Sequence, residues 1–386
     1  MVIAVPKEIM PGERRVAVTP ANVRPYLDLG FQVYVESGAG AGVYASDEEY
    51  SLAGAKIIGN TAELFKNADI ILKVKQPMFN KDVGEHEISM MKPGSTLVTF
   101  LHPAAPESHD NVRRLRDGRI TSFTMDGIPR ISRAQRMDAL TSMSTCTGYL
   151  AMLDAAHRLP WFVPMMATAI GTVKPAKVLV VGCGVVGLQA VATAKRLGAV
   201  THVFDIREAA RTEGASLGAK IDGFDVPPEI AMAEGGYARP LPKDWLAKER
   251  EALASSVAAS DIVILSALVP GDRAPVLITG EMVRSMKPGT VIIDVSVDQG
   301  GNCELTVPGK YTMVDNVEIC GIQNIPGRLP VHSSWLYSSN LCYYIANMFK
   351  QDRRCPDYED EIVANSLVTR DGKIMHPATL RAMGEV

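Results

Sequence analysis

The chain of 386 residues lacks the features that would mark it for nucleic acid or for a membrane. Its formal net charge is -3, with no basic excess and no run of like charge, so we expect no nucleic-acid partner. The longest apolar candidate, residues 163–173, is interrupted and shorter than the roughly 20 residues that a membrane span needs. We therefore predict a protein without direct membrane insertion.

The six cysteines also lack the spacing of a metal site or a disulfide framework. No two of them form a C-x-x-C motif and none has histidines at zinc-ligand spacing, so we expect no metal. Such thiols are typical of a reduced, cytoplasmic protein. The first residues, MVIAVPKEI, carry no cleavage-type signal and predict a first strand.

Apolar strands and polar-faced helices alternate along the first 125 residues, which predicts a parallel, doubly wound sheet. A polar stretch at 129–144 and a helix at 147–157 then bridge to a second domain. A helix at 334–349 and a hairpin at 370–372 most simply return to the first domain. We predict an α/β protein with two Rossmann-like doubly wound domains around a central cleft: residues 1–142 plus 327–386 on the substrate side, and 143–326 for the nucleotide.

The strongest motif lies in residues 177–207, KVLVVGCGVVGLQAVATAKRLGAVTHVFDIR. Gly182, Gly184 and Gly187 form G-x-G-x-x-G where an apolar strand turns into a helix. They permit a tight turn, a close backbone approach to a pyrophosphate and close helix packing, respectively. A second strand ends at Asp205, whose carboxylate can accept both ribose hydroxyls of NAD and repel the extra phosphate of NADP. NAD is therefore the predicted cofactor.

Four neighbours complete this predicted cofactor-binding motif: Val185, Val186, Ile206 and Arg207. Arg207 leaves some affinity for NADP open. Further along, residues 222–248 are rich in proline and glycine without periodicity, a composition typical of a functional lid or a disordered segment. The methionine pair at 165–166 is expected in the core.

Several stretches carry a resemblance that spans nearly the whole chain. They are VPKEIMPGERRVAVTP, VESGAGAG, the glycine motif, LVPGDRAPVLITGEMV and MKPGTVIIDVSVDQGGN. The chain resembles the family that joins alanine dehydrogenases with the NAD(H)-binding component of proton-translocating nicotinamide nucleotide transhydrogenase. The resemblance implies two Rossmann-like domains around a cleft, in agreement with the alternating pattern.

Much of the chain is similar to the transhydrogenase branch. PRISRAQRMDAL resembles that branch's loop over the nicotinamide, which implies cofactor contacts for Arg130, Gln135 and Asp138. EGGYA resembles its mobile loop, in which Tyr237 would close on bound nucleotide. By the same resemblance the cofactor site includes four further residues: Ser144, Ala267, Leu268 and Asp298.

Four positions are instead similar to the alanine dehydrogenase apparatus: Arg15, Lys75, His102 and Asp298. Transhydrogenase components typically lack the last three, because hydride passes to another nucleotide and no substrate acid or base is needed. Reductive amination of a 2-oxo acid needs a cation for the carboxylate, a donor to the carbonyl oxygen and a proton shuttle. Arginine, lysine and histidine suit these tasks in turn. We predict that Lys75, His102 and Asp298 are catalytic.

The substrate pocket predicted by this resemblance contains Arg15, Lys75, Phe100, Met143 and Asn324. Phe100 stands where alanine dehydrogenases usually have tyrosine, and Thr145 stands where they have glutamate, so alanine itself is not the expected substrate. Taken singly, each charged residue also has a structural explanation, such as a surface ion pair or a loop cap. Their occurrence as a set favours the functional interpretation.

Our first hypothesis is an NAD-dependent oxidoreductase that interconverts an L-amino acid and a 2-oxo acid, as a homodimer or higher homo-oligomer. The alternative is the soluble NAD(H)-binding alpha subunit of a proton-translocating NAD(P) transhydrogenase, which would have membrane subunits as partners. A third possibility is an NAD-binding regulatory protein without chemistry.

Overall fold

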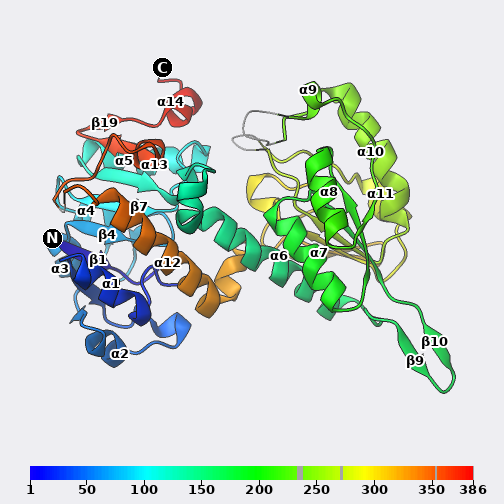
Figure 1. Cartoon of the computed structure of the whole chain (residues 1–386), viewed down its shortest axis with the longest axis horizontal. Helices are drawn as coiled ribbons and strands as arrows, with labels where there is room; N and C mark the ends of the chain where they lie inside the picture. The colour runs from blue at the N-terminus through cyan, green and yellow to red at the C-terminus, as the bar shows by residue number, and fades with distance from the viewer. Residues whose placement is uncertain (233–237, 270–272, 353, 386) are drawn as a thin grey trace. The chain divides into compact units, whose positions relative to one another are not determined.

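The computed structural model describes residues 1–232, 238–269, 273–352 and 354–385 and separates the chain into two compact units. Unit 1 comprises Met1–Met143 and Pro326–Val386, and unit 2 comprises Ser144–Ile325. Each boundary lies one residue from the predicted position. Both units are built on a largely parallel sheet with helices on its two faces, which confirms the predicted α/β fold class (Figure 1).

Unit 1 contains an eight-stranded sheet in the order β19-β18-β8-β7-β4-β1-β2-β3. Its parallel strands are β1 (Val2–Val5), β2 (Gln32–Glu36), β3 (Lys56–Ile58), β4 (Ile70–Leu72), β7 (Thr96–Thr99) and β8 (Thr121–Thr124). The C-terminal strands β18 (Leu367–Arg370) and β19 (Lys373–Ile374) extend the β8 edge antiparallel, and the hairpin predicted at 370–372 joins them. The sheet therefore contains strands from both ends of the chain.

Helices cover both faces of this sheet. They are α1 (Val23–Asp28), α2 (Asp47–Leu52), α3 (Thr61–Asn67), α4 (Glu87–Met90), α5 (His109–Asp117), α12 (Pro330–Met348), α13 (Glu361–Ser366) and α14 (Pro377–Met383). A short hairpin, β5 (Phe79–Asn80) with β6 (Glu85–His86), precedes α4. Successive strand residues face opposite layers, so Ile3 packs in the layer with α12 and Ala4 in the layer with α3 and α5.

Unit 2 contains a seven-stranded sheet in the order β13-β12-β11-β14-β15-β17-β16. Its parallel strands are β11 (Lys177–Val181), β12 (Val200–Phe204), β13 (Lys220–Ile221), β14 (Ile262–Leu265), β15 (Val291–Asp294) and β17 (Val317–Cys320), with β16 (Tyr311–Val314) antiparallel at one edge. Its helices are α7 (Val185–Arg196), α8 (Glu208–Ser216), α9 (Pro228–Ala231), α10 (Lys243–Ala258) and α11 (Gly280–Ser285). Because β11 lies between β12 and β14, the strand order changes direction at its carboxyl end.

Helix α6 (Ala139–Arg158) begins earlier than the predicted helix at 147–157, so the polar stretch at 129–144 is not all linker. The carboxylate of Asp138 accepts the N–H of Thr141 at 2.8 Å and thereby satisfies a donor of the first turn. Residues 222–248 likewise contain α9 and the start of α10, so this segment is partly helical. The proline-glycine content masked that helical structure.

The expectation that the methionine pair at 165–166 lies in the core was wrong. Met165 is 63% exposed and Met166 is 36% exposed. They lead into a hairpin of β9 (Met166–Thr168) and β10 (Gly171–Val173), which projects from unit 2 (Figure 1). Ile170, at the tip, is 99% exposed.

Candidate functional site

The glycine motif forms the turn between β11 and α7, as its sequence predicts. Gly182 has a φ of +87°, and a Cβ there would lie 2.6 Å from the backbone nitrogen of Ala267. At Gly187 an added Cβ would lie 2.1 Å from the carbonyl oxygen of Gly182. Both positions therefore require glycine for the structure of the turn itself.

Gly184 differs from its two neighbours, because no protein atom lies within 4 Å of where its Cβ would be. It is the N-cap residue of α7, and no side chain caps the helix there. Val185 and Val186 then form the first turn. An open surface above backbone N–H groups at a helix N-terminus fits a pyrophosphate, so the residues present fit a dinucleotide.

Asp205 lies at the end of β12, buried beside this turn, and its side chain contacts the protein through both oxygens. Oδ2 accepts the N–H of Cys183 (2.7 Å) and a guanidinium N–H of Arg207 (2.8 Å). Oδ1 accepts the backbone N–H (2.8 Å) and Nε (3.0 Å) of Arg207. A carboxylate offers about four acceptor sites, so four hydrogen bonds occupy this one within the protein. Ile206 lies between the two residues, half-buried.

Ala267 and Leu268 follow β14, the strand beside β11. Asn302, which the sequence did not single out, holds Ala267 by both backbone groups, at 3.0 and 2.9 Å. Asp294 in turn accepts the N–H of Asn302 at 2.9 Å. The stretch IIDVSVDQGGN thus supports the loop after β14, and its asparagine was the available signal.

Asp298 lies on a short 3-10 helix, Val297–Gln299, and is exposed. Its Oδ1 accepts Nε2 of Gln323 at 2.7 Å. Asn324 is the next residue and has a φ of +52°. Asp298 and Asn324, predicted to share a site, therefore lie on loops that are joined within unit 2.

The predicted nicotinamide loop lies in unit 1 before α6. Arg130 and Gln135 are exposed, and Asp138 caps α6 as described above. Ser144, half-buried on α6, is the first residue of unit 2. Tyr237, the residue expected to close on nucleotide, lies outside the described residues.

In unit 1, Lys75, Phe100 and His102 come together at the carboxyl ends of β4 and β7. Phe100 donates its N–H to the carbonyl of Val74, and Thr99 donates its hydroxyl to the carbonyl of Lys75 at 3.0 Å. The ring of Phe100 stacks on His102, with centroids 5.9 Å apart. The adjacent positions of β4 and β7 in the sheet explain this grouping.

His102 has a φ of +46°, an uncommon conformation for a residue other than glycine. Its side chain is 53% exposed, and Nδ1 lies 3.3 Å from Oδ2 of Asp126 after β8. Burial tends to raise the pKa of Asp126, but the charge of His102 and hydrogen bonds from His102 and Thr124 lower it to about 2. Asp126, a residue the sequence analysis missed, is thus held as an anion beside the predicted base.

Arg15 is buried at 3% exposure and forms a forked ion pair with Glu13. Its Nε lies 2.8 Å and Nη2 2.6 Å from the two carboxylate oxygens. Nη1 lies 3.1 Å from the sulfur of Met143, so two predicted substrate residues are in contact. The guanidinium is therefore fixed, and its charge is matched by Glu13.

A second buried ion cluster lies next to it and was not predicted. Lys73 contacts Glu87 at 2.9 Å and Glu8 at 3.4 Å, and all three side chains are almost fully buried. Glu8 also accepts the N–H of Val74 at 2.6 Å and that of Lys75 at 3.3 Å. This cluster fixes the backbone that carries Lys75.

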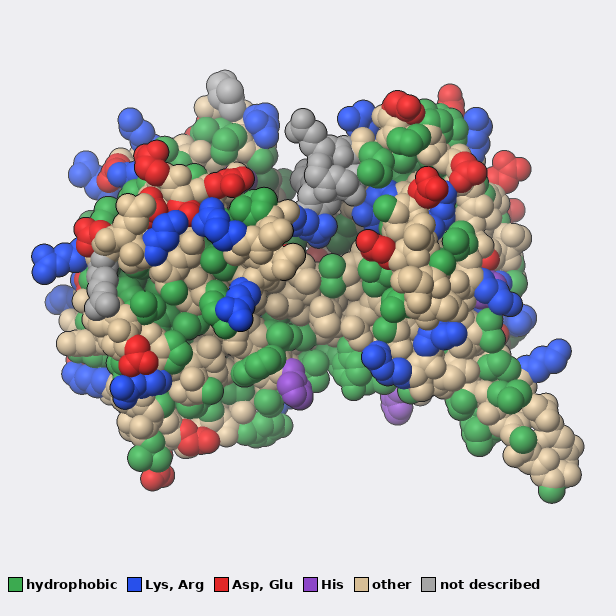
Figure 2. Space-filling view, viewed as in Figure 1, with side chains coloured by type: hydrophobic (Ala, Val, Ile, Leu, Met, Phe, Trp, Pro, Cys, Tyr) green, Lys and Arg blue, Asp and Glu red, His purple; other side chains and the backbone are tan. Residues whose placement is uncertain are grey.

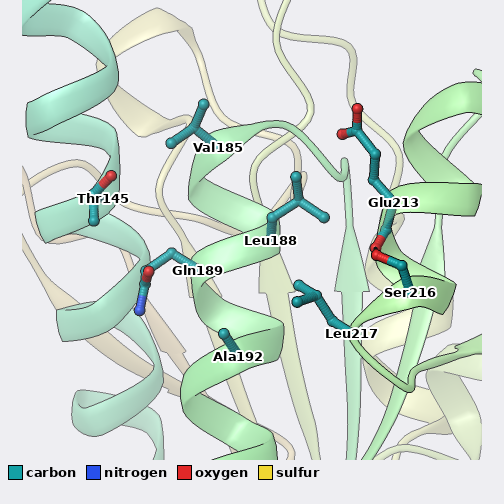
Figure 3. A pocket seen from close by; sticks show the side chains of 8 residues that line it. All are labelled: Thr145, Val185, Leu188, Gln189, Ala192, Glu213, Ser216 and Leu217. Atoms are coloured by element: carbon teal, nitrogen blue, oxygen red, sulfur yellow. Dashed lines mark hydrogen bonds between the residues drawn. The ribbon is translucent and has the colours of Figure 1, made fainter. Parts of the chain in front are cut away.

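A surface hollow of about 350 Å³ lies elsewhere in unit 2, between α6, α7 and α8. Thr145, Gln189 and Leu217 line it, and the Gln189 side chain points toward α6 (Figure 3). Val185 is the only residue of the predicted site among those lining the hollow in the described chain. The hollow is therefore distinct from the glycine turn.

The described residues contain no cluster of histidine, cysteine, aspartate or glutamate that could hold a metal ion. Within the same ranges, no helix has the length and apolar content to cross a bilayer.

Two family models match the chain. The N-terminal domain of alanine dehydrogenase/PNT matches residues 4–147, and the C-terminal domain of alanine dehydrogenase/PNT matches residues 151–377. A chain of the NAD(P) transhydrogenase subunit alpha from Rhodospirillum rubrum is 44% identical over 381 residues, which cover 98% of each chain. The "Alanine dehydrogenase" of Methanococcus maripaludis is 31% identical and covers 99% of this chain and 96% of its own length.

Among solved structures, "the crystal structure of transhydrogenase from Sinorhizobium meliloti" superposes with a TM-score of 0.84 at 40% identity. The match covers 97% of this chain and all of that chain. Fold and glycine turn thus define a two-domain, nucleotide-dependent oxidoreductase. The chain belongs to the alanine dehydrogenase/PNT family, which at that level confirms the predicted NAD-dependent enzyme and its cofactor. The higher identities to transhydrogenase components favour our alternative hypothesis over the amino-acid dehydrogenase.

Proposed function

We propose that this chain is the NAD(H)-binding component of an NAD(P) transhydrogenase. The observation that carries the proposal is the end-to-end similarity to the Rhodospirillum rubrum subunit, at 44% identity over 98% of both chains. The geometry supports it, because the glycine turn is intact while the Arg15 charge in unit 1 is matched by Glu13. A relay between two nucleotides needs no cation for a substrate carboxylate.

In this proposal unit 2 holds the dinucleotide. The turn at Gly182, Gly184 and Gly187 would hold the pyrophosphate, and the end of β12 would face the adenosine ribose. Bound NAD would supply the hydride-carrying ring. Arg130, Gln135, Asp138 and Tyr237 would surround that ring, as their resemblance to the transhydrogenase loops implies.

The partners in this proposal are membrane subunits of a transhydrogenase and a second copy of this chain. The projecting β9–β10 hairpin supports self-association, because its exposed residues include Met165, Met166 and Ile170 (Figure 2). Apolar side chains on a projecting hairpin are typical of a contact surface. We also keep, as a proposal, the cytoplasmic location predicted from the cysteines.

The test is reconstitution. The purified chain is added to membranes that carry the other transhydrogenase subunits but lack the NAD(H)-binding component. We expect NADPH-dependent reduction of the acetylpyridine analogue of NAD to return in proportion to added chain. Failure to restore exchange, with rapid NADH oxidation by a 2-oxo acid and ammonia, would overturn the proposal.

A second candidate is the NAD-dependent amino-acid dehydrogenase, in which a small amino acid or 2-oxo acid binds in unit 1. The observation that favours it is the grouping of Lys75, Phe100 and His102 at two adjacent strand ends, with Asp126 behind the histidine. Those are the acid, base and cation types that reductive amination needs. A screen of 2-oxo acids with ammonia and NADH distinguishes this candidate, because it requires no membrane.

A further inference from the structure

A second carboxylate, Glu249, lies near the adenosine end of the proposed nucleotide site. It is on α10 and only 6% exposed. Burial of Glu249, followed by the negative charge of Asp205, raises its pKa to about 7, while Arg250 opposes the shift. The interaction with Asp205 places Glu249 close to the residue that ends β12.

Aromatic contacts fix this face of α10 against the end of β12. Trp245 stacks on Phe224 with centroids 6.3 Å apart, and Phe224 lies 6.2 Å from Phe204. Glu249 is one helical turn after Trp245 and one turn before the buried Leu253, so all three share the face that packs on the sheet. Phe204 directly precedes Asp205 in the chain.

The carboxylate of Glu249 has no hydrogen bond or ion pair with any residue in the described ranges of the chain. Its neighbour Arg250 points elsewhere, since that guanidinium donates to the carbonyl of Val276 at 2.9 and 2.6 Å. A buried carboxylate without a partner is unfavourable unless something else supplies donors. A ribose offers hydroxyl donors.

Asp205 is poorly placed to be the sole acceptor. Its oxygens already accept four hydrogen bonds, from Cys183 and Arg207. Its charge is also balanced by the Arg207 guanidinium, with Nη2 2.8 Å away. The Asp205–Arg207 pair alone would therefore repel an added phosphate only weakly, whereas Glu249 has no cation paired with it in the described structure.

We propose that Glu249 accepts the 2′-hydroxyl of the adenosine ribose and is the residue that excludes a 2′-phosphate, so that it sets the preference for NAD over NADP. The inference rests on the proposed function only in requiring that unit 2 binds a dinucleotide. Asp205 and Arg207 then position the turn and the ribose, and Glu249 distinguishes the two nucleotides.

The test measures dissociation constants of NADH, NADPH and 2′-deoxy-NADH by titration at pH 8, for the full chain and Glu249→Gln. The control is Glu251→Gln, which removes the same charge from an exposed site on the same helix. We expect Glu249→Gln to weaken NADH about 10-fold and to lower the ratio of NADPH to NADH dissociation constants at least 10-fold. It should leave 2′-deoxy-NADH within about twofold, and Glu251→Gln should leave all three within about twofold.

The outcomes separate the two proposals. An unmodified chain that binds none of these nucleotides overturns the proposed function. A chain that binds NADH, with Glu249→Gln indistinguishable from Glu251→Gln, overturns only the role of Glu249. Thermal midpoints verify folding, and Glu249→Met, an apolar side chain of similar length, gives the same readout if the amide variant does not fold.

Discussion

The two sheets follow the same winding order and end in different chemistry. In unit 1 the order β3-β2-β1-β4-β7-β8 repeats the order β13-β12-β11-β14-β15-β17 of unit 2. After β11 the chain turns through glycines and presents backbone at the start of α7. After β1 it presents Glu8, which joins a buried cluster with Lys73 and Glu87. One sheet edge is therefore built from backbone conformation and the other from paired side-chain charges.

Winding order thus fixes where a site can form but not what the site can bind. A backbone turn at a helix N-terminus fits phosphates without committing a charged side chain. Paired buried charges instead fix side chains and leave little net charge for a ligand. The two units should consequently fail in different ways when their strand ends are altered.

The largest effect is expected from Lys73→Met, which breaks the charged edge of unit 1. The change leaves the carboxylates of Glu8 and Glu87 buried without their cation, so the free energy of unfolding should fall by about 3–5 kcal/mol. Urea unfolding measures this loss. Lys92→Met is the control, because its pair with Asp69 is partly exposed and should cost less than about 1 kcal/mol. Similar losses for both variants would show that the buried cluster does not stabilise unit 1.

The next effect concerns a carboxylate in unit 2 that has no such cation. Burial, and then Asp205, raises the pKa of Glu249 to about 7, so the folded chain keeps a proton that the unfolded chain releases near pH 4.5. The stability that this proton gives is present below pH 4.5 and is lost as pH rises through 7. A shift of this size corresponds to about 3 kcal/mol. Urea unfolding at pH 5 and pH 8 should show this decline in the unmodified chain and not in Glu249→Gln, and parallel profiles would contradict it.

A third change separates binding from folding at the backbone edge. Gly184→Ala meets no atom within 4 Å, so stability should change by less than about 1 kcal/mol. The added methyl group nevertheless occupies the surface that a pyrophosphate must approach, and NADH affinity should fall about 10- to 100-fold. Gly187→Ala is the contrast, because its Cβ would lie 2.1 Å from a carbonyl oxygen and should destabilise the turn. Unchanged NADH affinity in Gly184→Ala would exclude this surface as the phosphate site.

The fold could be predicted because its signals are local. Strand, glycines, helix and strand follow one another in residues 177–207, and the structure has them as β11, turn, α7 and β12. The start of α6 was misplaced because a polar cap, Asp138, precedes a helix whose first residues are not apolar. The exposure of Met165 and Met166 was missed because apolar composition alone does not reveal a projecting hairpin.

The features of the site that were missed depend on contacts between distant residues. No local pattern joins Glu249 on α10 to Asp205 after β12, since the two are 44 residues apart. The motif implies that Asp205 faces a ribose, but its four acceptor sites are filled by Cys183 and Arg207. Likewise, Asp126 reaches His102 only because β7 and β8 are paired. Sequence patterns name the strand ends, and the fold decides which side chains meet there.

The smallest effect is expected at His102, and it tests whether unit 1 performs chemistry. The side chain is 53% exposed and touches Asp126 rather than the buried ion clusters, so His102→Ala should change stability by less than about 1 kcal/mol. In the proposed transhydrogenase component, hydride exchange in reconstituted membranes should stay within about threefold. His332→Ala, an exposed histidine on α12, is the control. A dehydrogenase that used His102 as its acid and base would instead lose about 100-fold or more of its turnover of a 2-oxo acid, because a positioned proton donor is worth that much. That loss, seen in an enzyme that works without membranes, would transfer the chemistry from the backbone edge of unit 2 to the charged edge of unit 1.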